Sequence, residues 1–285
     1  MSGEWSTTHE IDLAYGRIRY HERGDGPPIV FVHGLLVNAE LWRKVIPTVA
    51  DAGYRCIAPD LPLGSHSIPV PRADLSPSGV ADLIADFLEA LGLEDVTLVA
   101  NDTGGALTQI LMTRHPERIG RVVLTPADSF ERFFPPAFAF LPPMSRIPGF
   151  IWILAQTLRL RFLHRLPFTF GWVAKRPIDR ATVDNYLSPS RKDRGIRKDL
   201  ARFLRGVNRR HTLAAAEKLP AFTKPVLLAW ATEEKLFPLS LAHRLDAILP
   251  DSQIVEIADS YTFVPEDQPD ELSGHILDFV STHVA

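Results

Sequence analysis

Short runs of Val, Ile and Leu alternate along the chain with longer stretches in which apolar residues recur at helical spacing. Such runs are typical of buried parallel strands, and the longer stretches are typical of the helices that connect them. We expect strands at 11–13, 18–21, 28–32, 56–59, 96–100, 122–125, 226–230 and 253–257, the first two as a hairpin. We expect helices at 39–52, 78–91, 106–115, 239–248 and 270–283. The pattern predicts an α/β fold with a mostly parallel sheet flanked by helices.

The alternation stops between residues 128 and 215, where the composition becomes aromatic, proline-rich and basic. Ten of the sixteen phenylalanines lie in this segment, together with Trp152 and Trp172. We interpret it as a helical cap inserted after the sixth strand, over a core formed by residues 1–127 and 216–285. The aromatic residues can close an apolar pocket above the sheet or form the core of the cap itself, and the two interpretations are compatible.

Charge and composition narrow the class of partner. The net charge of -3 over 285 residues gives no general attraction to nucleic acid. The basic run from Arg191 to Arg210 also contains acidic and apolar residues, which is more typical of a solvated helix face than of a phosphate or membrane site. Cys56 is the only cysteine, and no histidine and carboxylate cluster has metal-ligand spacing. We therefore expect a small apolar molecule as partner, no cofactor and no metal, while a homodimer stays open.

Neither a targeting segment nor a membrane span is predicted. Residues 1–10 lack the basic patch and apolar run of a secretory signal. The most apolar stretch, 150–158, is much shorter than the roughly 20 residues that cross a bilayer. We expect a cytoplasmic protein without membrane insertion.

The segment 96–105 is predicted to run from a strand through a tight turn into a helix, with Asp102 on the turn. A residue on such a turn needs small residues two positions before and after it, and Ala100 and Gly104 meet this need. The carboxylate of Asp102 can attack an electrophilic carbon and form an ester. The alternative, in which Asp102 only caps the helix that begins at Thr103, is less favoured.

A second loop, His33-Gly34-Leu35, follows the strand at 28–32. It is similar to half of an oxyanion hole, so the backbone N–H groups of Leu35 and Thr103 are expected to converge on developing negative charge. We expect His33 to stabilise the loop rather than to take part in the chemistry.

These segments together resemble the α/β-hydrolase superfamily over nearly the whole chain outside the cap. The residues that carry the resemblance are the His33-Gly34 loop, the Asp102 turn, Pro59-Asp60-Leu61-Pro62, Pro116-Glu117-Arg118, Phe263-Val264-Pro265 and Gln268-Pro269. An aspartate on the turn makes the chain most similar to the haloalkane dehalogenase and epoxide hydrolase branch. That resemblance implies a carboxylate that attacks and a histidine-activated water that then hydrolyses the ester.

The resemblance also implies an acid and a histidine that complete the site. The acid position, after the strand at 226–230, is held by Glu234, although a surface carboxylate beside Glu233 is the rival interpretation. The histidine position, directly before Phe263, is held by Thr262. Threonine cannot accept a proton near neutral pH, so the expected general base is missing.

Further departures bear on the substrate and on the missing base. Thr103 stands where haloalkane dehalogenases carry a halide-binding tryptophan, and Leu35 replaces a common polar residue. Epoxide hydrolases use cap tyrosines, and Tyr186 is the only tyrosine in the insertion. His164 and His211, in or beside the cap, are the remaining histidines that could reach the site.

Two hypotheses follow. The first is an enzyme that uses Asp102 as nucleophile or base on a small to medium apolar ester, epoxide or alkyl halide, with Glu234 and Thr262 forming a degenerate triad. The second is a ligand-binding protein with impaired catalysis, or a non-hydrolytic enzyme for proton transfer, elimination or cyclisation in the same pocket.

Overall fold

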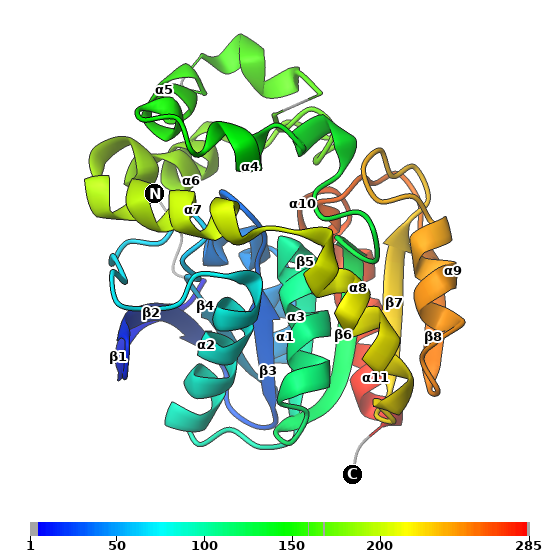
Figure 1. Cartoon of the computed structure of the whole chain (residues 1–285). Coiled ribbons are helices and arrows are strands. Elements are labelled where there is room, and N and C mark those ends of the chain that lie inside the picture. Colours follow the sequence, from blue (N-terminus) through cyan, green and yellow to red (C-terminus); the bar gives the residue numbers. More distant parts are fainter. Residues whose placement is uncertain (1–4, 159, 168, 284–285) are drawn as a thin grey trace.

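A sheet of eight strands forms the centre of the computed structural model, which describes residues 5–283 except 159 and 168 (Figure 1). The strands follow the order β1-β2-β4-β3-β5-β6-β7-β8 across the sheet. β2 pairs antiparallel with β1 and β4, and every other pair is parallel. The strands are β1 (Thr7–Leu13), β2 (Gly16–Arg23), β3 (Pro28–Val32), β4 (Arg55–Pro59), β5 (Val96–Asp102), β6 (Ile119–Ala127), β7 (Val226–Ala231) and β8 (Ser252–Ile257). The predicted mostly parallel sheet is confirmed.

Helices cover both faces of this sheet. α2, α3 and α8 lie side by side on one face, and α1 packs against α11 on the other (Figure 1). The core helices are α1 (Ile46–Asp51), α2 (Pro77–Ala90), α3 (Thr103–Arg114), α8 (Arg209–Lys218), α9 (Ser240–Asp246), α10 (Val264–Asp267) and α11 (Pro269–Thr282), with the 3-10 turn η4 (Leu219–Ala221). Because both faces are covered, β5 and β7 are buried almost throughout, as their uninterrupted apolar sequences require.

The single helix expected at 39–52 is wrong. The structure has a 3-10 turn, η1 (Ala39–Trp42), followed after a break by α1. Pro47 lies in the first turn of α1. A continuous helix through residue 47 is disfavoured, because proline has no backbone N–H to donate and its ring clashes with the carbonyl four residues earlier.

The cap enters after β6, as predicted, and lies above the carboxyl ends of the central strands (Figure 1). It contains η2 (Pro136–Phe138), α4 (Leu141–Met144), α5 (Phe150–Thr157), η3 (Arg161–Arg165), α6 (Arg180–Lys192) and α7 (Arg194–Gly206). The boundary expected at residue 216 falls within α8, and that helix packs along α3.

Buried polar contacts attach the cap to the core. Asp199 of α7 is 2% exposed and accepts a hydrogen bond of 2.7 Å from the backbone N–H of Val70. The same carboxylate lies 3.4 Å from the ring of buried His66, and Arg202 donates to the carbonyl of Ala73. Hydrogen bonds to a buried carboxylate are directional, so these contacts fix the position of the cap over the sheet.

Candidate active site

Asp102 occupies the turn between β5 and α3, with φ at 56° and ψ at -131°. A positive φ is costly for a residue with a side chain, and such strain is typical of functional turns. The side chain makes no capping hydrogen bond to the helix. The alternative in which Asp102 serves as a helix cap is therefore contradicted.

The backbone around this turn is packed too closely for side chains on its glycines. A Cβ on Gly104 would lie 2.5 Å from the carbonyl oxygens of Val32 and His33, and one on Gly34 would lie 2.1 Å from Asp102 Oδ2. Glycine at both positions is what allows the His33-Gly34 loop and the β5–α3 turn to touch.

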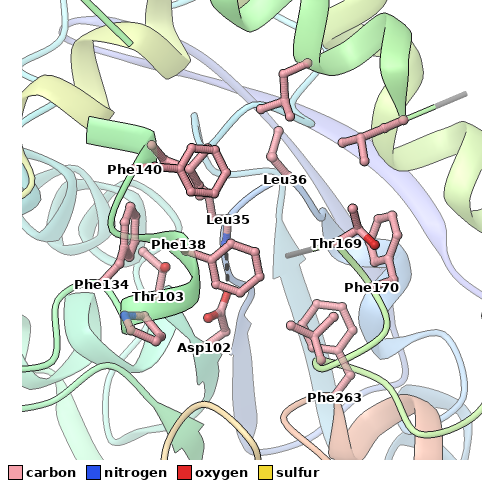
Figure 2. Close-up of a pocket in the computed structure, with 15 residues that line it drawn as sticks. Leu35, Leu36, Asp102, Thr103, Phe134, Phe138, Phe140, Thr169, Phe170 and Phe263 are labelled. Atoms are coloured by element: carbon pink, nitrogen blue, oxygen red, sulfur yellow. Dashed lines mark hydrogen bonds between the residues drawn. The ribbon is translucent and has the colours of Figure 1, made fainter. Parts of the chain in front are cut away.

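The Asp102 carboxylate faces the backbone of that loop. Leu35 N–H donates to Asp102 Oδ2 over 3.1 Å, the dashed bond in Figure 2. Burial raises the pKa of Asp102 to about 6, and the backbone N–H groups of Thr103 and Leu35 limit this rise. Among the described residues, Oδ1 accepts no hydrogen bond. One carboxylate oxygen is thus held by the backbone N–H of Leu35 while the other is left for chemistry.

A cavity of about 80 Å³ lies above Asp102, between the sheet and the cap. Figure 2 shows the carboxylate surrounded by aromatic rings from several segments. Asp102, Thr103 and Thr169 are the polar side chains among the described residues that line the cavity. The apolar lining consists of Leu35, Leu36, Phe134, Pro135, Phe138, Phe140, Leu141, Leu154, Leu158, Phe170, Val173 and Phe263. Some aromatic cap residues thus close a pocket, and others, such as Phe130 and Phe133, are buried in the core packing.

Glu234 and Thr262 meet beside this cavity without lining it. Thr262 is fully buried, and its hydroxyl donates to Glu234 Oε1 over 2.8 Å. Leu236 N–H and Phe237 N–H donate to the same oxygen. Glu234 Oε2 is buried and has no partner among the described residues. Burial raises the pKa of Glu234 to about 7, and those donors oppose the rise. A buried acid therefore presents one unused oxygen next to the threonine.

No histidine is found among the described residues that line the cavity. The ring of His33 accepts from Leu61 N–H at Nε2 over 2.8 Å, so its Nδ1–H donates to the carbonyl of Gly34. Burial lowers the pKa of His33 to about 4, so the ring is neutral and fixes the loop. His164 bonds the carbonyl of Leu158, and His211 bonds the hydroxyl of Ser78.

Asp128, directly after β6, was not selected from the sequence. It is fully buried, its Oδ2 lies 3.1 Å from the Thr103 hydroxyl, and its Oδ1 has no partner among the described residues. Burial, and then the charge of Asp102, raise the pKa of Asp128 well above its ordinary value. A signal was present, because β6 neighbours β5 and the carboxyl ends of parallel strands meet at one edge. The site therefore holds a second carboxyl group, which accepts a hydrogen bond from the hydroxyl of Thr103, the residue after Asp102.

The remaining polar groups contribute little to the cavity. Tyr186 is fully buried but does not line it, so the cap tyrosine is not placed to protonate a bound epoxide. The Thr169 hydroxyl is occupied, because it donates to the carbonyl of Leu166 over 2.9 Å. Within the described residues no group of three or more histidine, cysteine or acidic side chains could hold a metal ion.

Residues 27–269 match the model of the alpha/beta hydrolase fold family. Among curated proteins, the uncharacterized hydrolase YugF of Bacillus subtilis is 29% identical over 92% of this chain and 93% of its own. Haloalkane dehalogenase 2 of Mycobacterium tuberculosis is 28% identical over 94% and 93%. A cis-3-alkyl-4-alkyloxetan-2-one decarboxylase of Shewanella oneidensis is 27% identical over 96% and 88%.

Solved structures give the same fold. The epoxide hydrolase CorEH superposes with a TM-score of 0.82 at 19% identity, covering 97% of this chain and 99% of that one. The haloalkane dehalogenase DatA from Agrobacterium tumefaciens gives 0.81 at 23% identity, with 99% of each chain covered. These matches confirm the predicted α/β-hydrolase fold.

The buried acid predicts how stability depends on pH. The pKa of Glu234 is about 7 in the folded protein, against 4.5 for the free side chain. Between these values the folded chain keeps a proton that the unfolded chain has lost, so the free energy of unfolding falls as pH rises through this window. Glu234→Gln removes this dependence on pH. From pH 4.5 to about pH 7, the free energy of unfolding of the variant should therefore rise relative to that of the wild type by on the order of 2 kcal/mol, measured by urea unfolding.

The neighbouring Glu233→Gln is the matched control. A hydrogen bond from Lys175 lowers the pKa of exposed Glu233, so its small contribution has the opposite sign. Parallel stability curves for wild type and Glu234→Gln across the window would contradict the shifted pKa of Glu234.

Proposed function

The chain belongs to the alpha/beta hydrolase fold family, and we propose that it is an enzyme that acts on a small to medium apolar substrate through Asp102. The observation that carries the proposal is the position of this carboxylate. It is held on a strained turn, bonded by Leu35 N–H on one oxygen, and open to an apolar cavity through the other. Similar proteins include dehalogenases and an epoxide hydrolase, so we propose an alkyl halide, epoxide or ester as the substrate class.

The parts needed for attack are present in this arrangement. Asp102 Oδ1 would form a bond to an electrophilic carbon of the substrate while the leaving group departs with its bonding electrons. Leu35 N–H holds Oδ2 during this attack. When water later adds to the ester, the N–H groups of Leu35 and Thr103 would stabilise the negative charge that develops on Oδ2, and each such donor contributes about 3 kcal/mol in hydrolases. With pKa about 6, Asp102 is ionised at neutral pH, which attack requires.

The parts needed for hydrolysis of the resulting ester are incomplete. Water would have to be deprotonated beside the ester, and Thr262 stands at the position of the base in the related enzymes. Glu234 keeps a bonded oxygen and an unused one. We therefore propose a degenerate triad in which the acid remains and the imidazole is lost.

A non-hydrolytic reaction is the second candidate, and the pair of carboxyl groups favours it. When two nearby acids have different proton affinities, the weaker acid can donate a proton while the stronger one accepts another. Asp102 would remove a proton from the substrate, and the Thr103 hydroxyl would donate one to another substrate atom while protonated Asp128 replaces it. The proton then returns from Asp102 to Asp128, so the cycle balances without an imidazole.

Intact-protein mass after incubation with haloalkanes, epoxides and activated esters tests the nucleophile. We expect an adduct on the wild type that persists, because no base hydrolyses it, and no adduct on Asp102→Asn. Product formation should stop after about one equivalent. An adduct that survives in Asp102→Asn would exclude Asp102 as nucleophile, and sustained turnover would contradict the lost base. Turnover without any adduct would favour the proton-transfer candidate.

Thr262→His tests the degenerate triad. The imidazole would stand beside Glu234, whose unused Oε2 can accept its N–H, so it should be able to deprotonate water. We expect hydrolysis of the adduct to accelerate by about 10²-fold or more. Thr262→His with Glu234→Gln is the control and should lose most of that gain. A folded Thr262→His protein that holds its adduct as long as the wild type does would count against a conventional vestigial triad.

Infrared spectroscopy of the carboxyl groups tests the acid pair. Burial and the charge of Asp102 raise the pKa of Asp128 well above its ordinary value, so Asp128 should stay protonated at a pH where an ordinary aspartate is ionised. We expect a protonated carboxyl band that disappears in Asp128→Asn and remains in Asp60→Asn. Absence of this band in the wild type would remove Asp128 as a proton donor.

A further inference from the structure

Exposed apolar side chains are concentrated in one segment of the cap. Nine large hydrophobic residues are exposed in the part of the chain that the structure describes, and only Tyr15 and Leu213 of these lie outside the segment 140–172. Phe162 is 74% exposed, Ile153 56% and Trp152 50%. We define the outer cap surface as Ile147, Trp152, Ile153, Leu160, Phe162 and Trp172. Apolar groups concentrated in one segment mark an interaction site, unlike single exposed residues scattered over a surface.

The charge of the same segment is one-sided. Residues 132–178 hold seven of the 31 Lys and Arg residues and none of the 34 Asp and Glu residues. Lys175 and Arg176, at its end, form ion pairs with Asp259. Arg146 and Arg165 are exposed and form no ion pair with another described residue. The outer cap surface thus lies in a positively charged segment of a chain whose net charge is negative.

Helix α5 carries residues of the outer cap surface on one side and lines the cavity on the other. α4, α5 and η3 lie at the side of the cap away from the sheet (Figure 1). On α5, Trp152 and Ile153 are exposed, whereas Leu154 lines the cavity above Asp102. Phe140 is 37% exposed and also lines the cavity, so it lies at the connection between the two. A molecule that enters beside Phe140 would pass from an apolar exterior into an apolar interior.

We propose that the outer cap surface docks onto an anionic lipid bilayer. Tryptophan and phenylalanine insert at the boundary between headgroups and acyl chains, and arginines near them attract anionic headgroups. Docking in this way is peripheral. It agrees with the absence, in the described residues, of any helix long and apolar enough to cross a membrane. The role assigned here is distinct from the basic run 191–210, which we interpret as a solvated face.

Charge distinguishes a bilayer from a second copy of the chain. A two-fold dimer through this surface would pack the segment against a copy of itself, and so bring Arg146 and Arg165 to a second basic segment that contains no acidic partner. An anionic bilayer neutralises these charges and covers the apolar groups at once. The further step, that the bilayer supplies an apolar substrate to the cavity, rests on the proposed function.

Co-sedimentation with vesicles tests the docking. The wild type should bind vesicles of phosphatidylcholine mixed with phosphatidylglycerol, and bind vesicles of phosphatidylcholine alone more weakly. Ile153→Ser with Phe162→Ser should lower binding to the anionic vesicles by about tenfold or more, because both side chains would otherwise be buried. Arg146→Ala and Arg165→Ala should each lower it by about fivefold, and high salt should remove this difference.

Matched controls distinguish docking through the outer cap surface from non-specific adsorption to vesicles. Tyr15→Ser and Leu213→Ser remove exposed hydrophobic residues elsewhere and should leave binding unchanged. Asp102→Asn should also bind as the wild type does, so failure of the proposed chemistry and failure of docking give different results. Wild-type protein that stays in the supernatant, or an Ile153/Phe162 variant that binds normally, would overturn the proposal. A dimer in light scattering that this variant abolishes, without vesicle binding, would assign the surface to a second copy instead.

Discussion

The close contact between two backbone loops at the end of β5 is the constraint on which the site depends. Asp102 can reach Leu35 N–H only because Gly34 and Gly104 leave space between the loops, and a Cβ on either would collide with neighbouring atoms. The strain of a positive φ at Asp102 is held by the buried strand before it and the helix after it. Sheet, turn and helix therefore act together to fix one carboxylate oxygen and expose the other.

Burial without a neighbouring cation determines the electrostatics of this region. Asp102, Asp128 and Glu234 are bonded by backbone N–H groups or hydroxyls rather than by lysine or arginine. Burial raises the pKa of each, and least for Asp102 and Glu234, which have backbone donors. Asp102 is thus the group most ready to ionise, and its charge raises the pKa of Asp128 further. A site with this division can handle protons although no histidine lines its cavity among the described residues.

The sequence predicted most of the fold because uninterrupted apolar runs are a strong signal for buried parallel strands. Pro28–Val32 was predicted with the bounds observed for β3, and the insertion after the sixth strand follows from the loss of rhythm at residue 128. The prediction of one helix at 39–52 was wrong because it used apolar spacing alone, which takes no account of Pro47. The boundary expected at residue 216 falls within α8. This helix is polar and basic in sequence, like the cap before it, yet it packs on α3.

The site shows the same limit in another form. A motif in sequence located Asp102, but Asp128 belongs to no motif, and its importance comes from the pairing of β5 with β6. Pairing between strands distant in sequence decides which acids share a low dielectric, and composition does not contain that information.

For the same reason the cap could be recognised as aromatic but not as two-sided. Only the packing of α5 separates Leu154, which faces the cavity, from Trp152 and Ile153, which face outward. Apolar residues on both sides of one thin helical layer lower the cost of moving an apolar molecule through it, because each side offers an environment other than water. In the docking proposed here, the basic, acid-free composition of residues 132–178 would favour a negatively charged surface over a neutral one.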